Sequence, residues 1–152
     1  MQHTMLDNSF VSVVNGFNAA QATDNELNDL KELVYRRKVV ALKQQLLDRP
    51  AYLKFAARFG VLEQFRLKNY HDPEYPNILV INNLNRGQAV GARKLGNMWH
   101  SDSSYLPDPL PLTFLHAQRV PAGPGDTLFV DMQPALDELP ADLHDLIAGR
   151  QA

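Results

Sequence analysis

Short apolar runs alternate with polar segments along this chain, and their spacing predicts its elements. Residues 10–14 (FVSVV) indicate a short strand that ends at Asn15 and Gly16, a pair typical of turns. Residues 39–42 (VVAL) and 78–81 (ILVI) are short apolar runs with β-branched side chains, which favour buried strands. We therefore expect strands at these three places.

Thr23 begins the clearest helical pattern. Glu26 follows three residues later, and this spacing is that of a capping box, in which each residue satisfies a backbone amide of the other. The apolar residues Leu27, Leu30 and Val34 then recur at helical spacing. The pattern predicts one helix with a single apolar stripe.

A second helix is expected after Asp48, a residue type that caps helices and that here precedes Pro50. This helix should reach about Phe59. Residues 82–98 are polar and glycine-rich and lack a clear period. We expect a long loop there, of the kind that often covers or forms a binding site.

The last third of the chain combines two more apolar runs with a helical tail. Residues 112–120 and 127–131 predict strands, and helical spacing returns around residues 135–139 and again in the segment ADLHDLIAG. Because helices gather early and strands later, we predict one α+β domain over residues 1–152 with an antiparallel sheet.

Composition and charge narrow the chemistry. The 152 residues are 45% hydrophobic and 21% charged with a net charge of −2, which is ordinary for a globular protein and implies no nucleic-acid partner. We find no apolar run that would span a membrane and no signal-peptide pattern, so we expect a cytoplasmic protein. Because the chain has no cysteine, a metal would have to bind to His, Asp or Glu.

His100 and Asp102 form the strongest candidate site, in the stretch NMWHSDSSYLPDPLPL. If this stretch is a strand, residues two apart share a face, and an imidazole with a carboxylate can supply two ligands to a metal such as Fe(II). On spacing alone, a surface histidine that pairs with an acidic neighbour is the commoner arrangement. A Ser-His-Asp hydrolase is disfavoured because no nucleophile-elbow motif surrounds the nearby serines, Ser101, Ser103 and Ser104.

The surrounding motifs change this balance. The Trp-His-x-Asp sequence, the prolines after it and the segment GPGDTLF closely resemble the family of taurine dioxygenase and 2,4-dichlorophenoxyacetate dioxygenase. Weaker similarity extends upstream through FAARFGVLEQF and YPNILVINN. The resemblance implies an Fe(II)- and 2-oxoglutarate-dependent dioxygenase that uses O₂ to hydroxylate a small organic substrate and releases succinate and CO₂. It also implies a double-stranded β-helix, or jelly roll, with flanking helices.

The same resemblance assigns roles to individual residues. His100 and Asp102 match two iron ligands of the family, and Thr127 matches a threonine that binds 2-oxoglutarate. Three further residues are candidate substrate contacts by their position: His71, Ser103 and Tyr105. The alternative for these three is a solvated loop histidine and two turn residues in a proline-rich loop.

The resemblance further implies that the C-terminal half of the family fold is missing from this chain. The third iron ligand and the 2-oxoglutarate-binding arginine of the family lie far beyond the threonine, and His116, His144 and Arg150 do not match them. We therefore expect the chain alone to bind Fe(II) poorly and to turn over no 2-oxoglutarate. Its unpaired strand edges should favour homo-oligomers. The alternative is a catalytically inactive fragment or binding module of the same fold.

Overall fold

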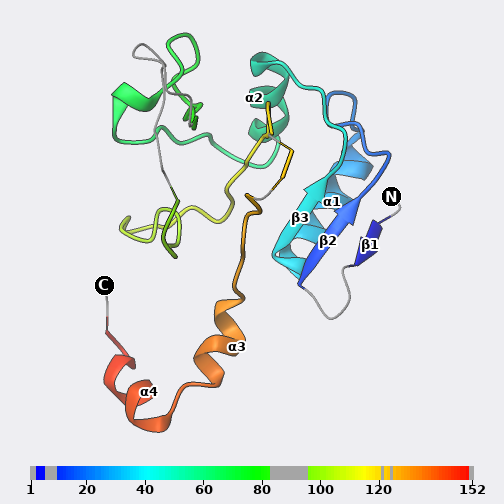
Figure 1. Cartoon of the computed structure of the whole chain (residues 1–152). Coiled ribbons are helices and arrows are strands. Elements are labelled where there is room, and N and C mark those ends of the chain that lie inside the picture. Colours follow the sequence, from blue (N-terminus) through cyan, green and yellow to red (C-terminus); the bar gives the residue numbers. More distant parts are fainter. Residues whose placement is uncertain (1–2, 6–9, 83–95, 121, 124, 151–152) are drawn as a thin grey trace. The chain divides into compact units, whose positions relative to one another are not determined.

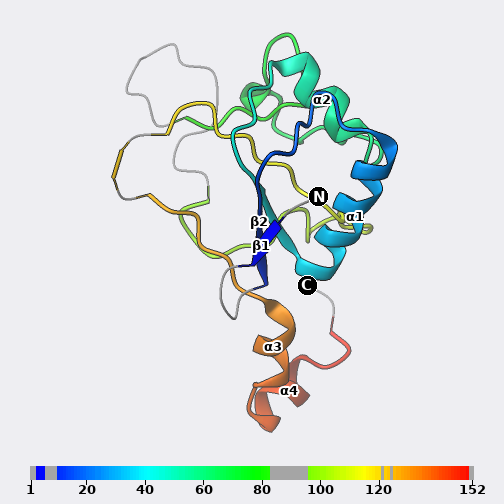
Figure 2. The same cartoon turned by 90° about the vertical axis from the view of Figure 1, so that its right-hand side faces the viewer.

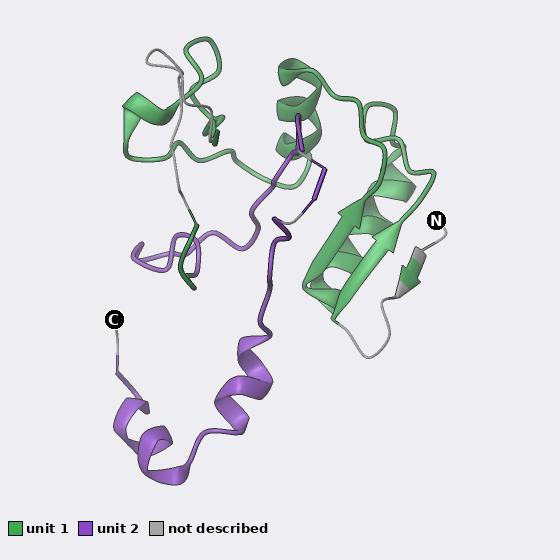
Figure 3. Cartoon of the chain, viewed as in Figure 1, with its two compact units in different colours: residues 1–100 green, residues 101–152 purple. Residues whose placement is uncertain are grey.

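The computed structural model describes residues 3–5, 10–82, 96–120, 122–123 and 125–150 (Figure 1). The chain divides into two compact units, residues 1–100 and residues 101–152 (Figure 3). None of the helices that the structure describes is both long enough and apolar enough to cross a membrane. Most of the long loop expected at residues 82–98 lies outside the described residues.

The first unit contains a three-stranded sheet with the order β1-β2-β3. Strand β1 (His3–Met5) pairs antiparallel with β2 (Val11–Val14), and β2 pairs parallel with β3 (Val39–Leu42). The strands expected at residues 10–14 and 39–42 are thus confirmed. The expectation of an antiparallel sheet holds for β1 and β2 but is wrong for β2 and β3, because α1 (Asp24–Arg37) supplies the crossover that a parallel pair requires.

The start of α1 is set by the predicted capping box. The Thr23 hydroxyl accepts a hydrogen bond from the Glu26 amide at 3.3 Å, and the Thr23 amide donates to the Glu26 carboxylate at 2.9 Å. Two of the amides that a helix start leaves unpaired are therefore satisfied within four residues of sequence.

One face of α1 packs on the sheet, as Figures 1 and 2 both show. Leu27, Leu30 and Leu33 are buried on this face, whereas Val34 is only half-buried. The predicted stripe is therefore confirmed at its first two positions. It turns toward Leu33 at the end, because the position of the sheet decides which side of the helix is covered.

The second helix, α2 (Arg49–Ala57), begins as predicted and ends two residues earlier than expected. Asp48 is its N-cap, and the Asp48 carboxylate accepts a hydrogen bond from the Ala51 amide at 2.8 Å. Pro50 lies in the first turn, where its missing amide hydrogen costs nothing. These contacts are local and follow from the residue types.

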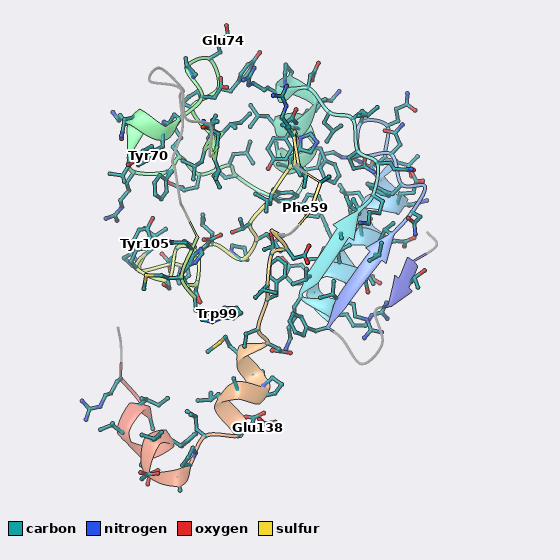
Figure 4. All side chains as sticks on the ribbon, in the orientation of Figure 1. Phe59, Tyr70, Glu74, Trp99, Tyr105 and Glu138 are labelled. Carbon is teal, nitrogen blue, oxygen red and sulfur yellow. The ribbon has the colours of Figure 1, made fainter. Side chains whose placement is uncertain are left out.

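An aromatic cluster joins α2 to the segment before α1. The ring of Phe55 lies edge-on to Phe17 at 6.1 Å and to Phe59 at 5.4 Å between centroids. Figure 4 labels Phe59. Nearby, the Arg58 guanidinium pairs with the Asp24 carboxylate at 2.6 Å, which connects the end of α2 to the start of α1. Edge-to-face aromatic pairs of this kind add to the stability that their burial provides.

The strand expected at residues 78–81 is not formed as a regular element. The segment instead makes an isolated antiparallel bridge between His71 and Leu79, just after the short 3₁₀ helix η1 (Lys68–Tyr70). The Val80 amide donates to the Tyr70 carbonyl at 3.1 Å. Because the partner segment leaves a helical turn only at residue 70, it offers few extended residues for pairing.

The second unit contains two helices, α3 (Met132–Asp137) and α4 (Ala141–Ile147), and no strand among its described residues. The strands expected at residues 112–120 and 127–131 are therefore not formed. Residues 112–116 still alternate between half-buried and exposed positions, as strand residues do. A strand is completed only by a partner that pairs with its backbone, and the described residues of this unit supply none.

Helix α3 begins three residues before the helical stretch that the sequence indicated. The Asp131 carboxylate caps it by accepting a hydrogen bond from the Gln133 amide at 3.1 Å. Pro134 lies inside the first turn, where proline is tolerated. The predicted break near Pro140 is confirmed, because Pro140 precedes α4 as its N-cap.

Candidate functional site

His100 ends the first unit and lies outside any strand. Its Nδ1 is 2.8 Å from the carbonyl oxygen of Met98. Since a carbonyl can only accept, Nδ1 carries the proton and donates it. The lone pair of the neutral ring is then on Nε2, the state in which histidine binds metals, with the other ring nitrogen held by a backbone carbonyl.

Gly96 lies against the ring of His100. A Cβ added to Gly96 would be 3.3 Å from Cε1 of His100, and the φ angle of Gly96 is +75°, a conformation that other residues rarely adopt. Both observations favour glycine at this position. Sequence reasoning did not identify Gly96, because its only signal was one glycine in a glycine-rich loop.

Asp102 lies in a turn of the second unit and is exposed. The strand expected through His100 and Asp102 is therefore not formed. A turn follows because Ser103 adopts a φ angle of +53°. That the two side chains face one metal stays a prediction. Among the described residues, no three His, Asp or Glu side chains gather into a group that could hold a metal.

Ser103 and Tyr105 differ in their surroundings. Ser103 is 9% exposed, and its hydroxyl accepts a hydrogen bond from the Leu110 amide at 2.9 Å. Tyr105 is an exposed side chain of the same turn (Figure 4). The Ser103 hydroxyl thus closes the proline-rich loop, which is the turn role that the sequence left open as an alternative. A role for either residue in binding substrate stays a prediction.

His71 lies in a segment that is held by its own polar contacts. Its Nε2 contacts the carbonyl oxygen of Phe65 at 2.5 Å and must donate there. The next residue, Asp72, is 3% exposed and pairs with Nε of Arg49 at 2.6 Å. Its carboxylate also accepts from the Glu74 amide at 3.1 Å. These bonds fix the backbone on which His71 is placed.

Thr127 lies in the second unit, in a stretch without regular secondary structure, and is exposed. Its role toward 2-oxoglutarate stays a prediction.

The two histidines that follow the motif, His116 and His144, lie in segments whose described residues show no features of a metal site. His116 accepts a hydrogen bond at Nδ1 from the Gln118 amide group at 2.7 Å, and His144 is exposed on α4. Neither arrangement suggests a ligand.

Comparison with known proteins agrees with the motifs. A model of the taurine catabolism dioxygenase TauD, TfdA family matches residues 4–152. This match includes His100, Asp102 and Thr127, and it extends over both compact units.

Individual relatives have related names. An alpha-ketoglutarate-dependent 2,4-dichlorophenoxyacetate dioxygenase of Cupriavidus pinatubonensis is 32% identical over 138 residues, which are 84% of this chain and 48% of that protein. The (S)-phenoxypropionate/alpha-ketoglutarate-dioxygenase of Sphingobium herbicidovorans is 32% identical over 148 residues, 97% of this chain and 50% of that protein. Pentalenolactone F synthase of Streptomyces avermitilis is 36% identical over 104 residues, 66% of this chain and 34% of that protein. The chain spans about half the length of the first two relatives.

Proposed function

This chain belongs to the taurine catabolism dioxygenase TauD, TfdA family, and we propose that it is the N-terminal portion of an Fe(II)- and 2-oxoglutarate-dependent dioxygenase. The relatives named above include two that depend on alpha-ketoglutarate by name. The observation that carries the proposal for this chain is the hydrogen bond from His100 to the Met98 carbonyl, because it prepares Nε2 for a metal.

Two residues of this chain would hold the metal. Nε2 of His100 and the carboxylate of Asp102 are a nitrogen and an oxygen donor, which suit Fe(II), and the chain contains no thiolate that would favour a softer metal. Fe(II), when bound, supplies the activation of O₂ that is coupled to the decarboxylation of 2-oxoglutarate to succinate. The role of His100 is to present one nitrogen while its other nitrogen stays bonded to the backbone.

The cosubstrate and the substrate would contact other residues. The hydroxyl of Thr127 would donate to the distal carboxylate of 2-oxoglutarate. His71, Ser103 and Tyr105 were expected to contact a small organic substrate, which the activity would hydroxylate. His71 and Tyr105 are kept as candidates, because the buried Ser103 hydroxyl is bonded to the Leu110 amide. Residues 112–116 alternate between half-buried and exposed positions, as the residues of a strand do. This alternation supports a jelly-roll fold in which a further segment of the protein would pair with them.

A titration with Co(II) tests the metal site directly. Co(II) is close to Fe(II) in the affinity series of divalent metals and is stable in air. Trp99, the only tryptophan, precedes His100 and is 68% exposed, so a paramagnetic ion bound by His100 should quench its fluorescence. We expect weak but saturable quenching that is lost in His100→Ala and reduced in Asp102→Ala.

His144→Ala is the matched control, because His144 is an exposed histidine of α4 far from the motif in sequence. It should bind Co(II) like the unchanged chain. Equal quenching in His100→Ala and the unchanged chain would overturn the proposal. A second assay measures succinate formed from 2-oxoglutarate with Fe(II), ascorbate and O₂. Succinate that disappears in His100→Ala would show that the chain acts as an enzyme by itself, whereas Co(II) binding without succinate would favour the binding module.

A further inference from the structure

The residue directly after Asp102 has three unusual properties. Ser103 is 9% exposed although it is polar, its φ angle is +53°, and it lies in a turn. This left-handed conformation is unfavourable for serine, because it brings the Cβ close to the following carbonyl oxygen. Such a conformation persists only where the surrounding bonds hold it.

Two hydrogen bonds hold Ser103 in this conformation. Its carbonyl accepts from the Leu106 amide at 3.0 Å, and its hydroxyl accepts from the Leu110 amide at 2.9 Å. One residue therefore closes a short turn with its backbone and a longer loop with its side chain. All of these groups belong to the second unit, as does Asp102.

The loop that the Ser103 hydroxyl closes is stiff. Residues 107–111 read PDPLP, so three of the five are prolines with fixed φ angles. Only Asp108 and Leu110 in this stretch have a backbone amide that can donate, and Ser103 binds the second of them. The serine hydroxyl thus connects the backbone beside Asp102 to a rigid segment.

We propose that Ser103 is a positioning residue that holds the backbone of Asp102 in a metal-binding orientation, and that it does not contact the substrate. The inference rests on the proposed function, because it takes Asp102 as a metal ligand. The burial of Ser103 and the use of its hydroxyl by the Leu110 amide both favour this role. The loop then contributes to metal affinity without touching the metal.

The test removes the bond from each side. Ser103→Ala removes the hydroxyl, and Leu110→Pro removes the amide hydrogen while Ser103 stays intact. Ser104→Ala is the matched control, because Ser104 is exposed and its hydroxyl contacts the Ser101 carbonyl at 3.4 Å, a longer distance than the Ser103–Leu110 bond. Metal affinity is measured by Co(II) quenching of Trp99 fluorescence, and circular dichroism checks that each variant is folded.

We expect Co(II) affinity to fall about tenfold in Ser103→Ala and in Leu110→Pro, in the range seen when groups that orient a metal ligand are removed. The double variant should be no weaker than the weaker single variant, because both changes break the same bond. Ser104→Ala should keep the unchanged affinity. In the metal-free chain, the Leu110 amide should be protected from hydrogen exchange. It should exchange faster in Ser103→Ala and stay protected in Ser104→Ala.

Three outcomes would overturn the inference. Unchanged Co(II) affinity in Ser103→Ala would overturn it and leave the proposed function standing. A Leu110 amide that exchanges freely in the unchanged chain would show that the bond does not form, with the same consequence. Quenching that is absent in the unchanged chain, or unaffected by His100→Ala, would overturn the proposed function and this inference together.

Discussion

The Nδ1 of His100 donates a hydrogen bond to the carbonyl oxygen of Met98, two residues earlier, at 2.8 Å. This bond to a neighbouring backbone carbonyl fixes one tautomer and one orientation of the His100 ring. A Cβ at Gly96 would lie 3.3 Å from Cε1 of the same ring, so a side chain there would push the ring from its position. The ring is therefore oriented before any metal binds, which reduces the entropy that binding would cost.

Gly96→Ala should weaken Co(II) binding about tenfold, because the added Cβ would displace the His100 ring from its position. The positive φ angle should also lower the free energy of unfolding by about 1 kcal/mol. Gly16→Ala separates the two effects: Gly16 has a φ angle of +72° and nothing within 4 Å of an added Cβ. Gly16→Ala should lower the free energy of unfolding by a similar amount without changing Co(II) affinity. Equal affinity of Gly96→Ala and Gly16→Ala would contradict the steric role.

The capping box of α1 should make stability depend on acidity. Hydrogen bonds from the Thr23 amide and hydroxyl lower the pKa of the Glu26 carboxyl below its ordinary value of 4.5. Because the folded pKa is the lower one, this contribution is complete above 4.5 and is lost as the pH falls through the folded pKa. Urea unfolding at decreasing pH should show the loss in the unchanged chain.

Glu26→Gln should remove this part of the pH dependence, since an amide can keep the hydrogen bonds but does not titrate in this range. Glu32→Gln, an exposed change on the same helix, is the control and should leave it in place. Identical pH profiles for Glu26→Gln and the unchanged chain would show that the Glu26 carboxyl does not contribute to the pH dependence.

Asp72→Ala should lower the free energy of unfolding by about 3 kcal/mol, because it removes a buried carboxylate that accepts charge-assisted hydrogen bonds. Asp72→Asn should cost less, since the amide oxygen can still accept from the Glu74 backbone while the attraction to Arg49 is lost. The Arg49 side chain is 60% exposed, so water can solvate its guanidinium when the partner carboxylate is removed. Asp29→Ala, at an exposed position of α1, should change stability by less than about 0.5 kcal/mol. Chemical unfolding monitored by circular dichroism distinguishes these variants.

Leu33→Ala should destabilise the chain by about 2–5 kcal/mol, the range for a leucine removed from a core. Val34→Ala should cost about 1 kcal/mol, because Val34 is half-buried and loses fewer atoms. Leu46→Ala is the exposed control, since Leu46 is 97% exposed. Unfolding free energies in urea rank the three variants. A larger loss for Val34→Ala than for Leu33→Ala would mean that the side of the helix with Val34, and not the side with Leu33, faces the core.

The sequence by itself determined the features that depend on contacts within about four residues. The capping box of Thr23 and Glu26 and the N-cap of Asp48 were predicted because the bonding groups are close along the chain. The strands at residues 11–14 and 39–42 were predicted from apolar, β-branched runs. The Trp-His-x-Asp sequence, the prolines after it and the segment GPGDTLF together indicated the family, because the residues within each motif are nearly adjacent.

The tertiary structure decided which distant segments meet. It paired β2 with β3 in parallel and turned the buried side of α1 toward Leu33. It also bonded Ser103 to Leu110 across the proline-rich loop. An apolar run at residues 112–120 specifies a tendency to extend, but a strand exists only where another segment supplies the partner for its backbone. Loops bring such segments together, and neither the residue types nor the hydrophobic periodicity of a segment shows which other segment it will meet.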